Sequence, residues 1–117
     1  MFRFKTRIAV VPLVGALLGC GGSYGSMAGP PPPANTVAAT NGLTFTPATL
    51  RVSAGTIVTF SFGSVAHNVF FAAQAGAPAD ITGNNASVSV DRRFDGTGTF
   101  TYTCHIHPQM HGTVEVQ

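Results

Sequence analysis

Residues 99–117 read TFTYTCHIHPQMHGTVEVQ, and this stretch decides how the rest of the sequence is interpreted. Threonine alternates with larger residues up to Cys104, and Val114 and Val116 alternate with polar residues at the end. Alternation with a period of two is typical of a strand that has one buried face. The stretch therefore predicts two strands joined by a short loop that begins at Cys104, whose thiol points inward.

The loop between these two strands is rich in side chains that bind transition metals. Cys104, His107 and Met110 follow one another at intervals of three residues. Thiolate, imidazole and thioether together suit copper, and one Cys, two His and a weak axial Met describe a blue-copper electron-transfer site. Pro108 restricts His107 to extended backbone, which favours a single loop shape. The spacing predicts a site for one copper ion, Cu(II)/Cu(I), that still needs a second imidazole.

One histidine upstream of the loop can supply that imidazole. His67 lies in the segment VAHNVFF at 65–71, where it shares parity with Val69 and Phe71. A strand that buries these two residues also turns His67 toward the interior. An isolated inward histidine is more often a core residue than a ligand, but here a separate loop lacks one nitrogen donor. We therefore predict that His67 completes the site.

Two further histidines lie in or beside the loop. Parity places His105 on the face opposite Cys104, and we interpret it as exposed. We interpret His111 as a neighbour of the loop on the solvent side. Either could bind a second metal ion or tune the pH response of the site, because imidazole titrates near neutral pH.

The N-terminus has the features of an export signal. Three basic residues precede an apolar run at 8–18, which is too short for a stable spanning helix. The run ends in Leu-Leu-Gly-Cys20, which resembles the bacterial lipoprotein box and implies a signal peptide at 1–19 and lipidation of Cys20. The alternative is ordinary cleavage near Ala28, which would discard Cys20.

The segment 20–35 predicts a spacer between a lipid anchor and a folded domain at 36–117. It is rich in Gly and Ser and has four consecutive prolines at 30–33, a composition that cannot bury a core. The protein is then exported to the periplasm or cell surface and held to the membrane. Two cysteines in an exported chain also permit a disulfide, which lipidation of Cys20 would exclude. Cys104 would then be a lone thiol that needs burial or a metal.

The charge balance changes once the signal is removed. The full chain carries six basic and four acidic side chains, but only three arginines follow residue 19. No basic patch with interleaved aromatic residues is left, which argues against a nucleic-acid partner.

The scaffold is predicted to be all strand and turn. We expect Ala54-Gly55 to join two alternating segments in a hairpin, and Asn41-Gly42 to form a turn. Residues 72–79 are expected to form a loop or a brief helical turn, and 91–98 a turn-rich segment. The expected strands at and before the loop are 36–39, 43–45, 50–53, 57–62, 65–71, 87–90 and 99–104. About seven to eight short strands indicate an antiparallel sandwich or a partly closed barrel.

Residues 40 to 117 resemble a known protein family. The residues that carry the resemblance are Phe45-Thr46-Pro47 with Leu50, Val52 and Gly55, then His67-Asn68-Val69, then Tyr102-Thr103-Cys104 with His107, Pro108, Met110 and Gly112. They are similar to those of cupredoxins, the plastocyanin and azurin family, with a loop length like that of amicyanins. The resemblance implies an eight-stranded Greek-key β-sandwich with the metal at one end.

The resemblance also implies a role for each site residue. His67 and His107 would be the nitrogen ligands, Cys104 the thiolate and Met110 the axial thioether. Asn68 matches the family's asparagine that ties the first ligand's strand to the cysteine-bearing strand, and such outer contacts orient ligands.

Three functions remain open from the sequence. The family transfers single electrons through the exposed edge of its loop histidine, here His107, to transient redox protein partners that dock on an apolar patch. Ile106, Pro108 and Pro47 are candidates for that patch. The alternative is a copper-binding module that delivers or buffers the ion. An enzyme is not expected, because one short domain, which we expect to be a monomer, offers too few ligands for a further copper centre.

Overall fold

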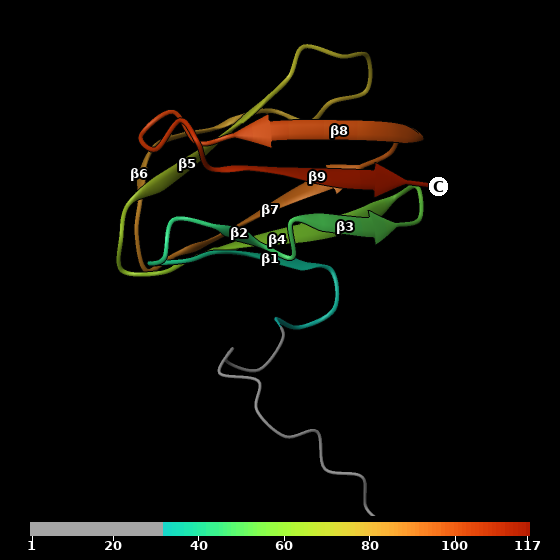
Figure 1. Cartoon of the computed structure of the whole chain (residues 1–117). Coiled ribbons are helices and arrows are strands. Elements are labelled where there is room, and N and C mark those ends of the chain that lie inside the picture. The colour runs from blue at the N-terminus through green and yellow to red at the C-terminus, as the bar shows by residue number, and fades with distance from the viewer. Residues whose placement is uncertain (1–31) are drawn as a thin grey trace, which may run out of the picture.

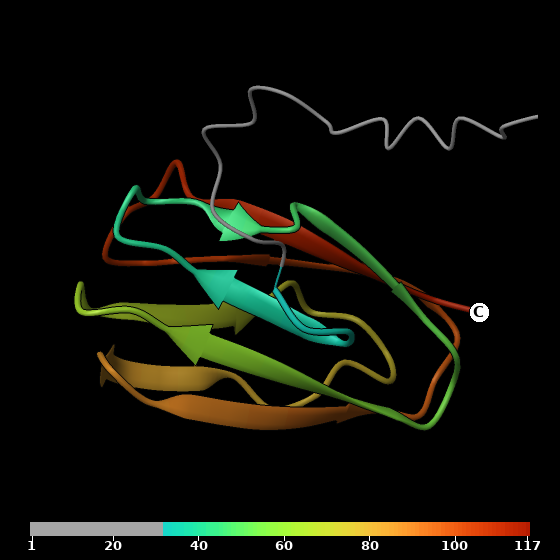
Figure 2. The ribbon, with the colours of Figure 1, turned by 90° about the horizontal axis from the view of Figure 1, so that it is seen from below.

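Residues 32–117, the part of the chain that the computed structural model describes, form nine β-strands in two sheets packed face to face (Figures 1 and 2). The strands are β1 (Thr36–Ala39), β2 (Phe45–Thr46), β3 (Thr49–Val52), β4 (Thr56–Phe62), β5 (His67–Phe71), β6 (Ile81–Asn85), β7 (Ser89–Phe94), β8 (Gly98–Thr103) and β9 (His111–Val116). The strand order is β2-β1-β4-β7 in one sheet and β3-β9-β8-β5-β6 in the other. The predicted all-β Greek-key sandwich is confirmed, with nine strands instead of seven or eight.

The predicted signal peptide at 1–19, the lipidation of Cys20 and most of the linker at 20–35 lie outside the described residues. At the described end of the linker, the Asn35 carbonyl accepts a hydrogen bond from the Thr59 amide at 2.9 Å. Pairing with the sandwich thus begins at the junction of linker and domain. Within residues 32–117, no helix is long and apolar enough to cross a bilayer.

The predicted hairpin between 50–53 and 57–62 is wrong. Both strands exist, but β3 pairs in parallel with β9 in one sheet, whereas β4 pairs with β1 and β7 in the other. The chain crosses from sheet to sheet at Ser53–Gly55. Each strand buries one apolar face against the shared core from opposite sides, so alternation along the chain looks the same as in a hairpin.

Two segments contain more strand than their sequences suggest. β6 has the sequence ITGNN, and Gly and Asn are disfavoured in strands. It is an edge strand that pairs with β5, and its three central residues are exposed. β7 continues to Phe94 through the segment expected to be turn-rich, because Val90 and Arg92 are half-buried and Phe94 is buried on one face, while Asp91 and Arg93 are exposed on the other.

An aromatic cluster fills the middle of the core. The Tyr102 ring meets Phe45, Phe60 and Phe71 edge to face, with centroids 4.8, 5.4 and 5.8 Å apart. Phe60 and Tyr102 are fully buried, and burying one such side chain contributes about 1.5–3 kcal/mol. These rings join the two sheets, since Phe60 lies on β4 and Tyr102 on β8.

The fold brings five strand termini to one end of the sandwich, drawn at the left of Figure 1. β8 ends opposite the start of β9, with Thr103 paired to His111. β5 begins at the same end, and its Phe70 also pairs with Thr103. The C-terminal residue of β1, Ala39, pairs with Phe62 at the end of β4. Side chains from segments far apart in sequence therefore meet at this end.

Candidate metal centre

The loop after β8 is closed by two backbone hydrogen bonds. The Cys104 amide donates to the Met110 carbonyl at 2.9 Å, and the Met110 amide donates to the His107 carbonyl at 2.9 Å. Cys104 is completely buried and Met110 is 2% exposed, while His107 is half-buried. The closed loop brings the backbones of Cys104, His107 and Met110 close together at this end of the sandwich.

His67 opens β5 and is completely buried, as its parity with Val69 predicts. It is paired with Asn85 on β6, whose Nδ2 donates to the His67 carbonyl at 3.0 Å. The backbone that carries the imidazole is therefore held on a rigid strand rather than on the loop.

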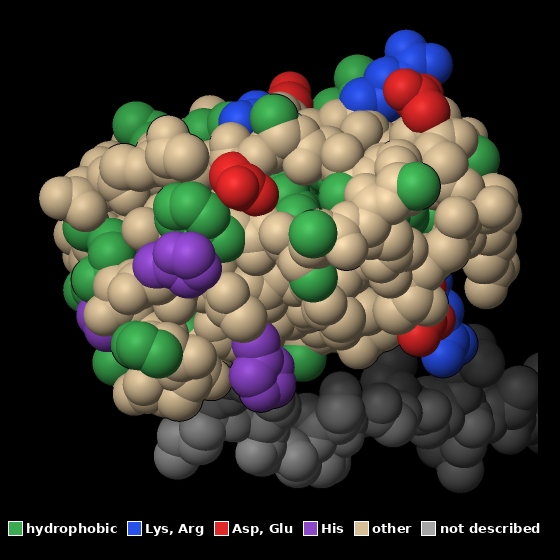
Figure 3. All heavy atoms as spheres, turned by 90° about the horizontal axis from the view of Figure 1, so that it is seen from above, with side chains coloured by type: hydrophobic (Ala, Val, Ile, Leu, Met, Phe, Trp, Pro, Cys, Tyr) green, Lys and Arg blue, Asp and Glu red, His purple; other side chains and the backbone are tan. Residues whose placement is uncertain are grey.

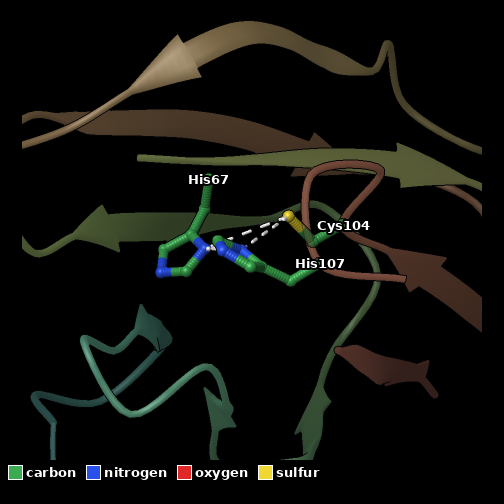
Figure 4. Close-up of side chains that lie close together, drawn as sticks. All are labelled: His67, Cys104 and His107. Atoms are coloured by element: carbon green, nitrogen blue, oxygen red, sulfur yellow. Dashed lines mark hydrogen bonds between the residues drawn. The ribbon is translucent and has the colours of Figure 1, made fainter. Parts of the chain in front are cut away.

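Three donor atoms converge on one point, as Figure 4 shows. His67 Nδ1 and His107 Nδ1 lie 3.2 Å apart, and Cys104 Sγ lies 3.9 Å from each. A point in their plane lies about 2.1 Å from all three atoms, close to the metal–nitrogen and metal–sulfur bond lengths of about 2.0–2.3 Å. Among the described residues, these three form a cluster with the geometry of a metal site.

The contact made by Nε2 of His67 shows which of the two ring nitrogens carries the proton. His67 Nε2 lies 2.8 Å from the Thr40 carbonyl oxygen, which can only accept a hydrogen bond. Nε2 therefore carries the proton, and in the neutral ring Nδ1 is left with a free lone pair. A hydrogen bond from the far nitrogen of an imidazole is the usual way in which a protein selects the ligating tautomer.

Asn68 links the strand of His67 to the loop of Cys104. It is 7% exposed, and its Oδ1 accepts a hydrogen bond from the His105 amide at 2.7 Å. This bond spans the gap between β5 and the residue after the cysteine, so both sides of the donor cluster are held by one side chain.

The other predicted residues lie around the cluster and not in it. His105 is exposed and stacks on Phe70, with ring centroids 3.8 Å apart and planes 4° from parallel. His111 is exposed at the start of β9. Ile106 is 39% exposed, and Pro108 is also exposed beside His107.

The surroundings of the cluster carry no formal charge. The Tyr102 phenol lies two residues before Cys104, and burial raises its pKa above the ordinary value. Among the described residues, the three segments that meet at this end, 40–44, 63–68 and 104–111, contain no Asp, Glu, Lys or Arg. The site therefore combines soft and imidazole donors in a region without formal countercharges.

A sequence comparison relates this geometry to known proteins. The family model for copper-binding proteins of the plastocyanin/azurin family matches residues 33–117. The chain belongs to this family. Copper is therefore its cofactor, in agreement with the prediction, and thiolate with imidazole is a donor set that suits copper.

Relatives of this cupredoxin include amicyanin-alpha of Methylorubrum extorquens, which is 36% identical over 73 residues, or 58% of this chain and 60% of the relative. The match thus spans about three fifths of the relative's length. A purple cupredoxin from Nitrosopumilus maritimus has a TM-score of 0.58 and 26% identity, covering 70% of this chain and 98% of that one. A fern plastocyanin variant has a TM-score of 0.60 and 28% identity, covering 70% and 99%. A reduced amicyanin variant has a TM-score of 0.61 and 27% identity, covering 70% and 80%.

Sequence reasoning missed two features that this cupredoxin uses around His67. The Thr40 carbonyl fixes its ring, and Asn85 holds its backbone. A backbone carbonyl leaves no mark in a sequence. Asn85 lies in β6, whose Gly- and Asn-rich sequence does not predict a strand. Its pairing with His67 was therefore not predictable either.

Proposed function

We propose that this protein is a type 1 copper protein that carries single electrons between redox partners in the cell envelope. His67 Nδ1, His107 Nδ1 and Cys104 Sγ would bind the ion, with the Met110 thioether as the axial ligand. The observation that carries the proposal is the triangle of these three donor atoms, with separations of 3.2, 3.9 and 3.9 Å. A Cys, two His and a weak axial Met describe a blue-copper electron-transfer site.

The protein's contribution is to keep the donors in place. When bound, copper supplies a one-electron couple whose potential depends on its ligands and their surroundings. Thr40 and Asn68 hold the two sides of the cluster, and Asn85 holds the backbone of His67. Because the donors are on a strand and a hydrogen-bonded loop, electron gain and loss require little movement of the chain.

The half-buried ring of His107 gives the site its route to the surface. Ile106 and Pro108 are exposed on either side of it in sequence and would form the contact surface for transient redox protein partners. Single exposed apolar residues are common, so this role depends on their place beside His107. Interfaces of this kind are small and short-lived.

The location of the protein is part of the proposal. We infer export through the signal at 1–19 and attachment to the membrane through lipidated Cys20, with residues 20–35 as the spacer. One acyl chain gives only marginal membrane binding, so stable attachment requires more than one chain on Cys20. The protein would act as a monomer and not as an enzyme.

Copper delivery or buffering is the alternative function. A delivery protein must release the ion to another site, whereas Cys104 and His67 are completely buried here. Burial of the donors favours retention, and therefore favours electron transfer.

The test is to load the purified protein with Cu(II) and record its visible absorption and electron spin resonance. We expect an intense blue thiolate–copper band that is lost in Cys104→Ser and lost or changed in His67→Ala. His111→Ala is the matched control, because this histidine is exposed beside the loop, and it should keep the band. A band that survives in Cys104→Ser would overturn the proposed site. Rapid surrender of the reduced ion to a soluble chelator would favour delivery instead.

A further inference from the structure

The turn between β1 and β2 carries the carbonyl that holds His67. The Thr40 carbonyl accepts hydrogen bonds from His67 Nε2 at 2.8 Å and from the Leu43 amide at 3.1 Å. Within the turn, the Thr40 amide donates to the Thr44 carbonyl at 2.9 Å, and the two threonine hydroxyls lie 2.7 Å apart. The acceptor for the His67 ring is therefore part of a closed turn, and the position of that turn decides how the ring is held.

The side chain of Asn41 joins this turn to the segment that leads into β5. Its Oδ1 accepts a hydrogen bond from the Val65 amide at 3.1 Å, and its Nδ2 donates to Ser64 Oγ at 2.9 Å. A Cβ added at Gly63 would lie 2.6 Å from Asn41 Oδ1, so the carboxamide sits directly against this segment. Val65 precedes His67 by two residues. One side chain thus connects the carbonyl acceptor to the backbone that carries the ring.

The backbone of the turn is itself unfavourable without such support. Leu43 has a φ of 61°, in the left-handed region that residues other than Gly, Asn and Asp rarely adopt. A residue held in this region persists only where its surroundings over-determine the conformation. The Thr40 and Thr44 bonds and the Asn41 link to Ser64 and Val65 provide that constraint.

We propose that Asn41 is a positioning residue for the copper site and holds the Thr40 carbonyl on His67 Nε2. The inference rests on the proposed function, in which His67 Nδ1 binds copper. Loss of the Asn41 link would let the turn and the Ser64–Val65 segment move separately. The Nε2–H would then lose its acceptor for part of the time, and the free lone pair on Nδ1 would no longer keep a fixed direction.

The test compares Asn41→Ala and Ser64→Ala with the wild-type protein and with Asn84→Ala as the matched control. Asn84 is an exposed asparagine on β6 and should behave like the wild type. The first measurement is the exchange rate of the His67 Nε2 proton by NMR in the copper-free protein. The second is the Kd for copper, and urea unfolding gives the global stability of each variant.

We expect Asn41→Ala to speed exchange of this proton by about tenfold and to weaken copper binding by about tenfold, the lower end of the effect of losing an outer contact. Ser64→Ala removes only one of the two bonds and should show a smaller change, while Ser64→Thr keeps the hydroxyl and should restore wild-type values. A merely structural role would change exchange only in proportion to the loss of global stability.

The outcomes separate this inference from the proposed function. A folded Asn41→Ala with the exchange rate and Kd of the wild type would overturn the positioning role. If Asn41→Ala does not fold, an unchanged exchange rate in Ser64→Ala would have the same meaning. If His67→Ala binds copper as well as the wild type, the proposed function fails, and the exchange measurement without copper still decides whether Asn41 holds the ring.

Discussion

The two ends of the sandwich differ in the side chains that they present. One end carries the donor cluster, and its loops contain no formally charged residue within the described part of the chain. The opposite end carries two ion pairs, Arg51–Glu115 at 2.7 Å and Arg93–Asp95 at 2.6 Å. Figure 3 shows the histidine side chains toward one end of the molecule and the charged side chains toward its middle and other end.

The donor end and the charged end therefore have different roles on the same scaffold. Exposed ion pairs contribute little to stability, so the two ion pairs at the charged end are not what holds the fold together. The uncharged end holds buried donors by hydrogen bonds that run between loops and strands. The aromatic core lies between the two ends, and substitutions should affect one end, the other or both according to where they fall.

The largest effect is expected in the shared core. Phe60→Ala removes a fully buried ring that contacts Tyr102 and Phe71. We expect a loss of about 3–5 kcal/mol in the free energy of unfolding, because a cavity remains. Urea unfolding measures this loss. Amide hydrogen exchange should show lower protection at both ends of the sandwich. Protection lost at only one end would mean that the two ends unfold independently.

Copper removal should affect the donor end more than the charged end. A ligand that binds only the folded state stabilises it by about 4 kcal/mol at a concentration of 1,000 Kd. We expect the copper-free protein to unfold at lower temperature in calorimetry. Amide exchange should rise most in the loop at 104–110 and the turn at 40–44, and should rise in β3 only by as much as the loss of global stability allows. A rise in β3 as large as that in the loop would contradict the separation of the ends.

Gly112 tests the packing beneath the donor loop. A Cβ at this buried position on β9 would collide with the ring and hydroxyl of Tyr102. Gly112→Ala should cost about 1–3 kcal/mol in unfolding free energy, because the ring must move within a dense core. The reduction potential should also shift, since Gly112 lies only two residues after Met110 at the end of the loop. Gly96→Ala, where the nearest atom is 3.6 Å away, is the matched control for unfolding by urea.

Tyr102→Phe should stabilise the protein. The Tyr102 hydroxyl is buried without a hydrogen-bond partner among the described residues, and leaving such a group unpaired costs about 1–3 kcal/mol. Its removal should raise the free energy of unfolding by about 1 kcal/mol while the aromatic contacts remain. Denaturant midpoints measure this directly. A lower midpoint would show that the hydroxyl has a partner in solution.

The smallest effect is expected at the charged end. The Arg51 side chain is 71% exposed, and removing an exposed ion pair changes stability by about 0–1 kcal/mol. Arg51→Ala should leave the copper absorption unchanged. Electron exchange between copies of the protein, followed by NMR line widths, should also vary less than about threefold with ionic strength, since the donor end is uncharged. A steep salt dependence would place the contact surface nearer the charges.

The donor residues were predictable because the metal imposes them on the sequence. A thiol, an imidazole and a thioether at three-residue intervals suit few purposes, and parity alone placed His67 and Cys104 inside and His105 outside. The Ala54-Gly55 turn shows the opposite case. The same alternation fits a hairpin or two strands in different sheets, and only the pairing of β3 with β9 decides.

The sequence alone determined the chemistry of this protein, because residue types and their two-residue period set which atoms can bind an ion and which face is buried. Only the tertiary structure decided how those atoms are held. The Thr40 carbonyl, the Asn41 side chain and Asn85 act on His67 across long separations in sequence. Such contacts depend on how the strands of the sandwich pair, and a local pattern does not specify that.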